Sequence, residues 1–519
     1  MKTQRVVIIS LILLNCVSWS ATAFAVKYDP TVERVQFELV ERGYDPGPVD
    51  GKSGKKTTEA LKKYQEENKL EGTGEFDEKT LKKLKIKPPK FKCAAYGCTV
   101  ENGLTDEMVE QIKQHVSENR KADDLTLRNA TNTDLKKLPA LNDEFIALTI
   151  SRSKYITDMT PLGKLTNLAE RLTIDTAENL ADLSPLRKLT QLESLTLRKL
   201  GQPLVLAPLA QLAKLERLTL ASLNTDVKEP FDMTVLTGKP RLTTLILDNV
   251  KVQDLSFLKD SPELSSLRLD EVPVEDLSPL ADCPKLRSLE LSKVPVKDLN
   301  PIRELAKLRS LVLYHTEVTD LSPLTAFKDQ LTRLNLNGIK ATDMTPVGEL
   351  TALHDIFLDE TRFDDYSPLA KCTELKFLQA RSEKSGFNTL EVLTSLPKLE
   401  TLWLDRNDKI QDWEPLKTAT SIRNLSVGKT SFSDLSLLEN FTNLEDLNIY
   451  GCTVQHPEAI TKLPKLKRIS LNDVKGIDDI TIFKELPRLK ELYLGYRSKQ
   501  FPQEQIDEIE AAKKAVKKQ

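Results

Sequence analysis

A short apolar pattern recurs through most of the chain. The motif Leu-x-x-Leu-x-Leu returns every 22 or 23 residues, as at residues 264–269, 286–291 and 308–313. In an extended segment alternate side chains point to opposite faces, so the last two leucines of each motif share one face of a short strand. One strand cannot bury that face alone, whereas copies stacked in parallel bury a continuous leucine layer. The pattern therefore predicts a parallel solenoid.

Seventeen copies of the motif can be counted, and the two widest gaps between them run from Leu218 to Leu245 and from Leu378 to Leu402. Each copy predicts one strand. The predicted strand cores begin near Leu125, Leu148, Leu172, Leu195, Leu218, Leu245, Leu267, Leu289, Leu311, Leu334, Ile356, Leu378, Leu402, Leu425, Leu447, Ile469 and Leu492.

A second pattern follows many of these strands. The sequence Asp-Leu-Ser-Pro-Leu stands at residues 182–186, 276–280 and 320–324. Serine is a common helix N-cap, and proline is tolerated at the first helical position. We therefore expect the serine to cap a short helix or 3₁₀ turn on the outer, convex side of each repeat.

Residues 104–500 resemble leucine-rich-repeat proteins of the bacterial internalin type. Cys452 occupies the Asn/Cys position of that family's pattern. Most repeats instead carry valine or threonine at this position, as at Val272, Val294 and Thr316. The resemblance implies an α/β repeat fold, a leucine-rich-repeat solenoid of about 17 parallel strands over residues 125–500. Seventeen strands side by side would form a broad inner surface, so we expect the concave face to recognise a macromolecule.

The ends of a solenoid need caps, because the last leucine layer would otherwise face water. Residues 104–124 are predicted to form the N-terminal cap, with a helix that begins after the hydroxyl of Thr105. Its apolar positions are Met108, Val109, Ile112 and Val116. Residues 501–519 are predicted to form a C-terminal capping helix, with Ile506 and Ile509 facing inward.

The first 25 residues have the features of a secretory signal peptide. Lys2 and Arg5 precede an apolar run, and Ala23 and Ala25 frame a small-residue cleavage site. An acylated Cys16 is the alternative, which Asn15 disfavours. No later apolar run is long enough to span a membrane. We therefore expect an exported protein in the periplasm, on the cell surface or secreted.

Residues 26–86 resemble the three-helix peptidoglycan-binding domain. The matching positions are Gly-Tyr at 43–44, Asp-Gly at 50–51, Gly-Lys-Lys-Thr at 54–57, Ala-Leu at 60–61 and Tyr-Gln at 64–65, while Ser53 replaces a usual bulky residue. The resemblance implies a peptidoglycan partner, although related domains also bind proteins. The alternative for each residue is a purely structural role in folding the loop. The candidate ligand-binding residues, with exposed ring faces expected for the two tyrosines, are Tyr44, Asp50, Gly51, Gly54, Thr57, Tyr64 and Gln65.

Residues 87–103 are predicted to be a Lys- and Pro-rich linker that contains Cys93 and Cys98. Their closeness favours a local disulfide, with two free thiols as the alternative. No histidine stands near them in the sequence, so metal ligation is not expected. Cys283 and Cys372 take positions where other repeats have leucine, and Cys452 is similar, so all three are predicted to be buried.

Composition and chemistry narrow the functional classes. The net charge is -2 and the pI is near 6.3, which gives no overall field for nucleic acid. The four histidines lie in different repeats or in the cap, and neither a nucleophile elbow nor a glycine-rich phosphate loop is present. The sequence therefore predicts a monomeric binding protein without cofactor, metal or catalytic site.

Aromatic residues gather at predicted concave positions of the later repeats. The earlier repeats have threonine there, as at Thr126, Thr149, Thr173, Thr196 and Thr219. Aromatic side chains are frequent anchors of interfaces, so we expect a protein partner on the later repeats. The alternative is that single exposed aromatic residues merely suit β-structure. The candidate partner-binding residues are Tyr314, Phe357, Phe377, Trp403, Tyr450 and Tyr493.

These inferences favour an exported, non-catalytic binding protein that holds the wall through its small domain and a protein through its repeats; a host-directed adhesin is one version. The main alternative is a periplasmic scaffold or regulatory protein in which both domains bind protein. A third class, an exported peptidoglycan hydrolase, would require a catalytic constellation that the sequence does not show.

Overall fold

The computed structural model describes residues 28–119, 121–223, 229–363, 365–383, 387–495 and 501–516. The predicted signal peptide and the alternative at Cys16 lie outside these residues. The chain divides into two compact units, Met1–Pro89 and Lys90–Gln519.

The first unit is a small helical domain. Its described helices are α1 (Pro30–Glu41), α2 (Lys55–Glu67) and α3 (Glu78–Lys83). Asp29 and Asp77 cap α1 and α3, because their side chains accept hydrogen bonds from Thr31 N and Thr80 N. A separate apolar core joins the helices. The predicted three-helix architecture is confirmed, and this core is distinct from that of the repeats.

The second unit is a leucine-rich-repeat solenoid. Strands β3 to β19 each contain one of the predicted strand cores, which confirms the seventeen predicted parallel strands among the described residues. The bounds are β3 (Asp124–Arg128), β4 (Ala147–Ser151), β5 (Arg171–Ala177), β6 (Ser194–Leu200), β7 (Arg217–Ala221), β8 (Thr244–Asp248), β9 (Ser266–Asp270), β10 (Ser288–Ser292), β11 (Ser310–Val312), β12 (Arg333–Asn335), β13 (Asp355–Phe357), β14 (Phe377–Gln379), β15 (Thr401–Trp403), β16 (Asn424–Ser426), β17 (Asp446–Asn448), β18 (Arg468–Ser470) and β19 (Glu491–Tyr493).

The register of the sheet follows the leucine motif. Leu267 pairs with Leu289, which pairs in turn with Leu311, and the same correspondence holds from β3 to β19. From β3 to β18 both apolar residues of the Leu-x-Leu pair are buried, as Leu289 and Leu291 show with exposures of 0%, whereas Leu492 and Leu494 of the last repeat are partly buried. The residue between the two members of each pair faces the concave side. Burial of one face thus sets the register, because a shift of one residue would turn every leucine toward water.

The expected linker is too long. Residues 87–103 were predicted to separate the two domains, but the structure forms a hairpin there from β1 (Lys90–Ala94) and β2 (Gly97–Glu101). The two strands pair antiparallel, and β2 continues the solenoid sheet by pairing in parallel with β3. Lysines and prolines suggested a spacer, but alternate residues of β2 are buried, with Cys98 and Val100 only 4% and 2% exposed. Of the predicted linker, only residues 87–89 precede the hairpin.

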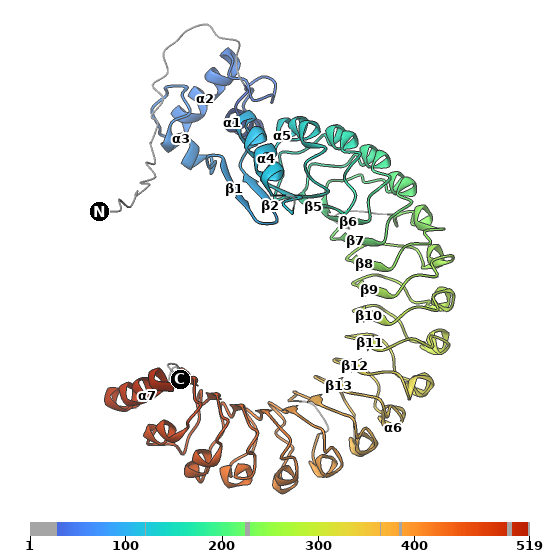
Figure 1. Ribbon diagram of the computed structural model, residues 1–519, viewed down its shortest axis with the longest axis vertical. Helices are drawn as coiled ribbons and strands as arrows, with labels where there is room; N and C mark the ends of the chain where they lie inside the picture. Colours follow the sequence, from blue (N-terminus) through green and yellow to red (C-terminus); the bar gives the residue numbers. More distant parts are fainter. Residues whose placement is uncertain are drawn as a thin grey trace, which may run out of the picture. The chain divides into compact units, whose positions relative to one another are not determined.

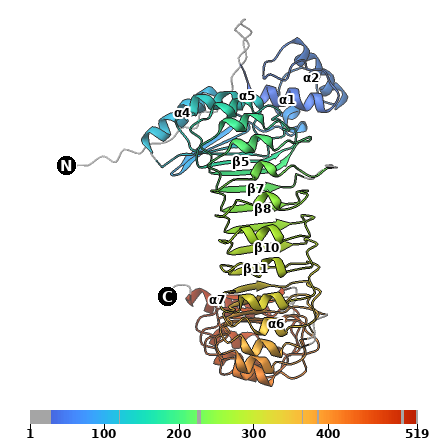
Figure 2. The same ribbon diagram turned by 90° about the vertical axis from the view of Figure 1, so that its right-hand side faces the viewer.

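Short helices line the outer side of the arc of repeats, and the strands line its inner side (Figures 1 and 2). Most are 3₁₀ helices, one of the two forms that the sequence predicted. Their bounds are α5 (Asn132–Lys137), η1 (Leu138–Leu141), η2 (Thr160–Lys164), η3 (Ser184–Lys188), η4 (Ala207–Gln211), η5 (Thr234–Leu236), η6 (Ser256–Leu258), η7 (Ser278–Asp282), η8 (Asn300–Ile302), η9 (Ser322–Phe327), α6 (Thr345–Gly348), η10 (Ser367–Lys371), η11 (Glu391–Ser395), η12 (Glu414–Thr418), η13 (Leu435–Leu438), η14 (Pro457–Lys462) and η15 (Thr481–Glu485).

In the Asp-Leu-Ser-Pro-Leu segments the aspartate, and not the serine, accepts the hydrogen bonds at the start of the turn. The prediction that serine caps the turn is therefore wrong. In η7 the N-cap position is Leu277, and Ser278 and Pro279 are the first helical residues. Asp276 Oδ1 accepts hydrogen bonds from Ser278 N at 2.8 Å and from Ser278 Oγ at 2.6 Å. A carboxylate makes stronger, charge-assisted hydrogen bonds than a hydroxyl, so the aspartate takes the capping role and the serine becomes a donor.

Helices cover both ends of the leucine layer. At the first end α4 (Asp106–Glu118) begins at Thr105, whose hydroxyl accepts from Met108 N at 3.2 Å. Val109 and Ile112 are buried against the repeats. At the other end lies α7 (Gln503–Val516), where Ile509 is 2% exposed and Ile506 packs partly buried against the core. Both predicted caps are present.

The three free cysteines of the described repeats are buried, as predicted. Cys283, Cys372 and Cys452 are each at most 1% exposed. Burial raises the pKa of the Cys283 thiol to about 11 and that of the Cys372 thiol to about 12. These thiols therefore behave as small apolar groups. Among the described residues, none of the helices has the length and apolar character needed to cross a membrane.

Candidate binding surfaces

Three of the predicted concave aromatic residues form one cluster. Phe357 and Trp403 lie in the same row of the sheet, with Gln379 between them. Phe377 lies two residues before Gln379 in β14, and its ring centroid is 4.9 Å from that of Phe357 and 5.1 Å from that of Trp403. We call Phe357, Phe377 and Trp403 the aromatic cluster. It joins three consecutive strands, β13 to β15.

Two arginines lie over this cluster. The guanidinium carbon of Arg333 is 4.7 Å from the ring centroid of Phe357, and that of Arg381 is 5.4 Å from the ring centroid of Trp403. Asp359 holds Arg381 in this position, since Arg381 Nη2 donates to its carboxylate at 2.9 Å. Cations over aromatic faces are attracted by the ring electrons and hold the side chains in a fixed arrangement.

The later repeats contain a hollow of about 1260 Å³ on their concave face. Trp403, Tyr450 and Tyr493 line it, together with the arginines at 362, 381, 406 and 468. We call this space the concave hollow. Tyr314, Phe357 and Phe377 do not line it, although His315 does. Of the six predicted residues, three line the hollow and Tyr314 lies outside it. Phe377 packs against Trp403, and Phe357 packs against Phe377.

The place of Tyr450 depends on a glycine one repeat earlier. A Cβ atom at Gly428 would lie 1.9 Å from Tyr450 Cδ1, so the tyrosine ring occupies the space that a side chain would need. Arg406 hydrogen-bonds Tyr450, which is the main reason that the pKa of the guanidinium is raised. Asp405 lies 7% exposed beneath this region and accepts from Ser426 Oγ at 2.6 Å and from Gly428 N at 2.9 Å. The floor of the concave hollow is therefore held by hydrogen bonds.

The earlier repeats present a row of threonines. Thr126, Thr149, Thr173, Thr196 and Thr219 stand side by side in register on strands β3 to β7, as the sequence predicted. Thr99 of β2 extends this row by one strand. The sequence interpretation missed Thr99 because it assigned the hairpin to a linker. The alternating pattern of residues 97–101 is the signal that could have found it.

In the small domain, several predicted site residues are buried. Tyr64 is 3% exposed and Gln65 and Thr57 are 0% and 2% exposed. The expectation of an exposed ring face on Tyr64 is therefore wrong, because the ring belongs to the core between the helices. Gly51 is buried too, since a Cβ there would lie 2.3 Å from Tyr28 Cδ2. These four residues shape the loop from within.

Two glutamines hold the turns of this domain. Gln36 Oε1 accepts from Asp50 N at 3.0 Å and Gly51 N at 2.9 Å, while its Nε2 donates to Thr57 Oγ1 at 3.1 Å. Gln65 acts similarly, since its Oε1 accepts from Gly74 N at 2.7 Å and its Nε2 donates to Thr80 Oγ1 at 2.9 Å. The sequence interpretation missed Gln36. A polar residue at a helical core position, between Val35 and Leu39, is the signal that marks it.

The accessible part of the predicted site consists of Tyr44, Asp50 and Gly54. Asp50 and Gly54 are exposed, and Tyr44 is half-buried. The Tyr44 hydroxyl donates to Glu67 at 2.6 Å, and this bond is the main cause that raises the pKa of Tyr44 to about 12. Nearby, Asp45 and Lys56 form an exposed ion pair at 3.1 Å. We call Tyr44, Asp45, Asp50, Gly54 and Lys56 the loop surface.

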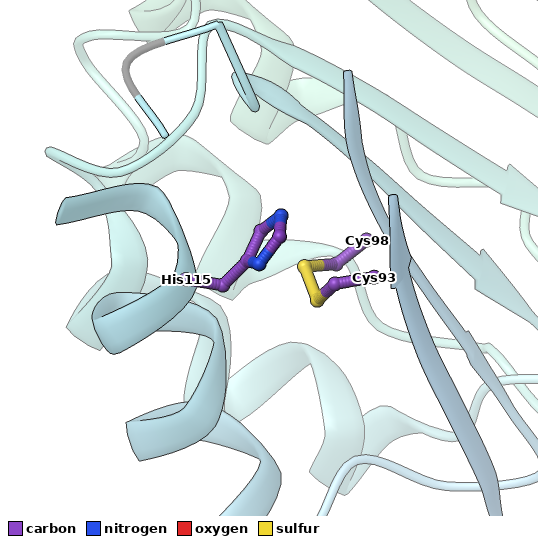
Figure 3. Close-up of side chains that lie close together, drawn as sticks. All are labelled: Cys93, Cys98 and His115. Carbon is purple, nitrogen blue, oxygen red and sulfur yellow. A yellow bond between two sulfur atoms is a disulfide. The ribbon is translucent and has the colours of Figure 1, made fainter. Parts of the chain in front are cut away.

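Cys93 and Cys98 lie directly opposite each other in the hairpin and are joined by a disulfide. No histidine stands near them in the sequence, but the fold brings one close. His115, in the last turn of α4, points toward the disulfide (Figure 3). One ligand atom from each of the three residues lies within 4.8 Å of the other two. Helix α4 packs over the hairpin, which brings His115 close although it stands 17 positions after Cys98 in the sequence.

Comparison with known proteins identifies the small domain. Residues 28–84 match the family model of the putative peptidoglycan binding domain. The putative peptidoglycan binding domain thus covers all three helices of the first unit and the loop surface. A comparison of the chain with curated proteins finds no match.

The repeats resemble solved leucine-rich-repeat structures. A leucine-rich-repeat protein of Leptospira interrogans is 19% identical, with a TM-score of 0.52, over 75% of this chain and 92% of that one. This likeness shows the leucine-rich-repeat fold. An internalin of Listeria monocytogenes, InlF, is 26% identical, with a TM-score of 0.47, over 64% of this chain and 88% of that one. The functional domain of InlJ from Listeria monocytogenes is 19% identical, with a TM-score of 0.45, over 64% of this chain and 74% of that one.

Proposed function

We propose that this chain is an exported, non-catalytic binding protein of the cell envelope. In this proposal the small domain associates with peptidoglycan and the repeats recognise a protein. One observation carries it: a domain that matches a peptidoglycan-binding family precedes a solenoid whose concave hollow gathers aromatic and arginine side chains. Both surfaces offer side chains for noncovalent recognition, and the proposal assigns neither of them a covalent reaction.

The loop surface is the proposed contact with peptidoglycan. The half-buried Tyr44 ring offers an edge and part of a face to a sugar, while Asp50 and the Asp45–Lys56 pair offer hydrogen-bonding groups to the glycan and peptide parts. The buried residues Thr57, Tyr64 and Gln65 support this surface without touching the ligand.

Retention of the full chain on purified sacculi tests this contact. We expect Tyr44→Ala to lower the affinity by about fivefold, since loss of stacking on one aromatic ring costs about 1 kcal/mol. Tyr44→Phe keeps the ring and gives up only the bond to Glu67, so it should be retained like the unchanged chain. Glu71→Ala removes an exposed carboxylate outside the loop surface and serves as a second control. The contact is disproved if the unchanged chain is not retained at all.

The concave hollow is the proposed centre of protein recognition. Trp403 is positioned by Phe377 and Arg381, so little side-chain freedom is lost when a partner covers it. Tyr450 and Tyr493 also line the concave hollow, and Tyr493 is 51% exposed. Aromatic residues and arginines in such a setting are the residues that usually dominate the energy of protein interfaces.

Crosslinking in the native cell, followed by mass spectrometry, identifies the partner, and purified variants then test the surface. We expect Trp403→Ala and Tyr450→Ala each to weaken binding about tenfold or more. Tyr314→Ala removes an aromatic residue from the same concave face outside the hollow and should have little effect. Equal binding by Trp403→Ala and the unchanged chain would show that the docking face lies elsewhere.

Location on the cell surface or in the periplasm distinguishes an adhesin from a scaffold. We propose export on the basis of residues 1–25, whose features match a signal peptide. Protease treatment of intact cells separates the two versions. An adhesin on the surface is cut by the protease, whereas a periplasmic scaffold is protected until the outer barrier is broken.

A further inference from the structure

The hairpin that begins the solenoid and the first capping helix together hold three metal-binding side chains. Cys93 comes from β1, Cys98 from β2 and His115 from α4, and their ligand atoms lie within 4.8 Å of one another. Figure 3 shows the histidine ring beside the two sulfur atoms. With the disulfide closed, the sulfurs are poor ligands, because metals bind the thiolate form of cysteine.

We propose that reduction of the Cys93–Cys98 disulfide converts this cluster into a site for one thiophilic divalent cation such as Zn²⁺. A dithiol reductant supplies two electrons and two protons, the S–S bond breaks, and the reductant leaves as its own disulfide. The cation then binds two thiolates and one imidazole nitrogen, and the two thiol protons are released to solvent. This inference is independent of the proposed binding partners.

The surrounding backbone keeps the three side chains together after the disulfide opens. Residues Lys90 to Ala94 pair antiparallel with Gly97 to Glu101, and β2 also pairs along its whole length with β3. The two cysteines are only 5 positions apart. A disulfide that closes so short a loop removes little conformational entropy from the unfolded chain, so it adds little to the stability of the hairpin. The strand pairing therefore holds the hairpin, and opening the disulfide leaves the sulfurs facing each other.

The histidine is held toward the hairpin by its own hydrogen bond. His115 Nε2 lies 3.0 Å from Ala94 O, and because a carbonyl oxygen only accepts, the ring donates. Hydrogen bonds of metal-binding histidines to backbone carbonyls commonly orient the ring. The helix that carries His115 is fixed at its start by Thr105 and along its length by Val109 and Ile112. The ligand positions are thus set by three separately stabilised elements.

The chemistry of the ligands selects the metal. Two thiolates with one imidazole favour Zn²⁺ over the harder ions Mg²⁺ and Ca²⁺, which prefer oxygen ligands. Three protein ligands leave a fourth tetrahedral position for water. Cys93 and His115 are half-buried and Cys98 is 4% exposed, so the cation and the reductant reach the site from the Cys93 side. The thiols of Cys283, Cys372 and Cys452 are buried inside the repeats and do not compete.

Titration with Co²⁺, a spectroscopic substitute for Zn²⁺, tests the site in the full chain carrying Cys16→Ser. We expect the reduced, oxygen-free chain to bind one Co²⁺ with thiolate-to-cobalt charge-transfer absorption and the strong visible bands of tetrahedral coordination. The oxidised chain and Cys93→Ser/Cys98→Ser should show neither. His115→Ala should bind about tenfold or more weakly, whereas His354→Ala, which alters a histidine of a distant repeat, should bind normally.

Circular dichroism of each sample checks that reduction and substitution leave the fold intact. The proposal is overturned if the folded, reduced chain shows no charge-transfer absorption, or if the absorption persists in Cys93→Ser/Cys98→Ser. Normal Co²⁺ binding by His115→Ala would show that His115 is not a ligand of the cation.

Discussion

Single polar residues inside the repeats connect the turns of the solenoid. At the Asn/Cys position of the leucine-rich-repeat pattern, the hydroxyls of Thr361 and Thr430 each donate to the carbonyl three residues earlier in their own repeat. Asn407 is 2% exposed and donates both to Leu404 O of its own repeat at 2.8 Å and to Ala380 O of the preceding repeat at 2.6 Å. Asn407 therefore links two neighbouring repeats by hydrogen bonds, whereas each of these threonines donates only within its own repeat.

We expect Asn407→Ala to lower the free energy of unfolding by about 1–3 kcal/mol, because it leaves buried carbonyl oxygens without their donors. Asn407→Thr should lose less, since a threonine hydroxyl can still donate to Leu404 O. The midpoint of urea unfolding measures both changes. A threonine variant as unstable as the alanine variant would show that the bond to the preceding repeat carries the whole effect.

At the scale of elements, the turns that lead into the convex helices depend on ionised aspartates. Hydrogen bonds from Ser278, Ser322 and Thr345 lower the pKa of Asp276, Asp320 and Asp343 respectively. The native state thus favours the charged carboxylate. The stability that this gives is fully present above the unfolded pKa of about 3.9 and is lost as the pH falls through the lower folded values.

The melting temperature of the chain should therefore fall as the pH drops below about 4. In a variant carrying Asp276→Asn, Asp320→Asn and Asp343→Asn, the amide oxygens still accept the turn hydrogen bonds but no longer titrate. We expect this variant to melt lower than the unchanged chain at pH 7 and to lose less further stability on acidification. If the melting temperatures of the two proteins fell equally on acidification, the role of these carboxylates would be contradicted.

At the scale of the whole repeat unit, stability depends on covering the last leucine layer. Ile509 of α7 is 2% exposed, and with Ile506 it lines a cavity of about 220 Å³ against Leu492 and Leu494. Because repeats contact mainly their neighbours, loosening this cap should open the final repeats before the rest.

We expect Ile509→Ala to destabilise the C-terminal end by about 2 kcal/mol, near the lower limit for buried isoleucine. Limited proteolysis followed by mass spectrometry should show earlier cleavage within the last repeats. Glu504→Ala, at an exposed position of the same helix, provides the matched control. Cleavage that begins instead in the middle of the solenoid would argue against end fraying.

Much of the repeat unit could be predicted because its contacts are periodic. Every predicted strand core from Leu125 to Leu492 lies in an observed strand. The exceptions are residues whose role depends on a partner elsewhere in the chain. Lys239 stands where other repeats have leucine, yet it is 5% exposed, and its ammonium donates to Ala210 O at 2.6 Å and Leu212 O at 3.2 Å. Composition alone would have placed it in solvent.

The candidate sites were predictable only in part, for the same reason. The sequence located the aromatic residues on the concave face, but the packing of Phe377 between Phe357 and Trp403 arises from side chains of three different repeats. In the small domain the motif residues were found, while their division into buried supports and an exposed loop surface required the helices to be assembled.

The sequence by itself determined the leucine-rich-repeat fold and its register, because alternation within a strand and burial of one face are local properties repeated along the chain. The tertiary structure alone decided that the predicted linker becomes the first hairpin of the sheet and that His115 meets the Cys93–Cys98 pair. Such contacts join segments with no common period, so they form only when the helix closes over the strands.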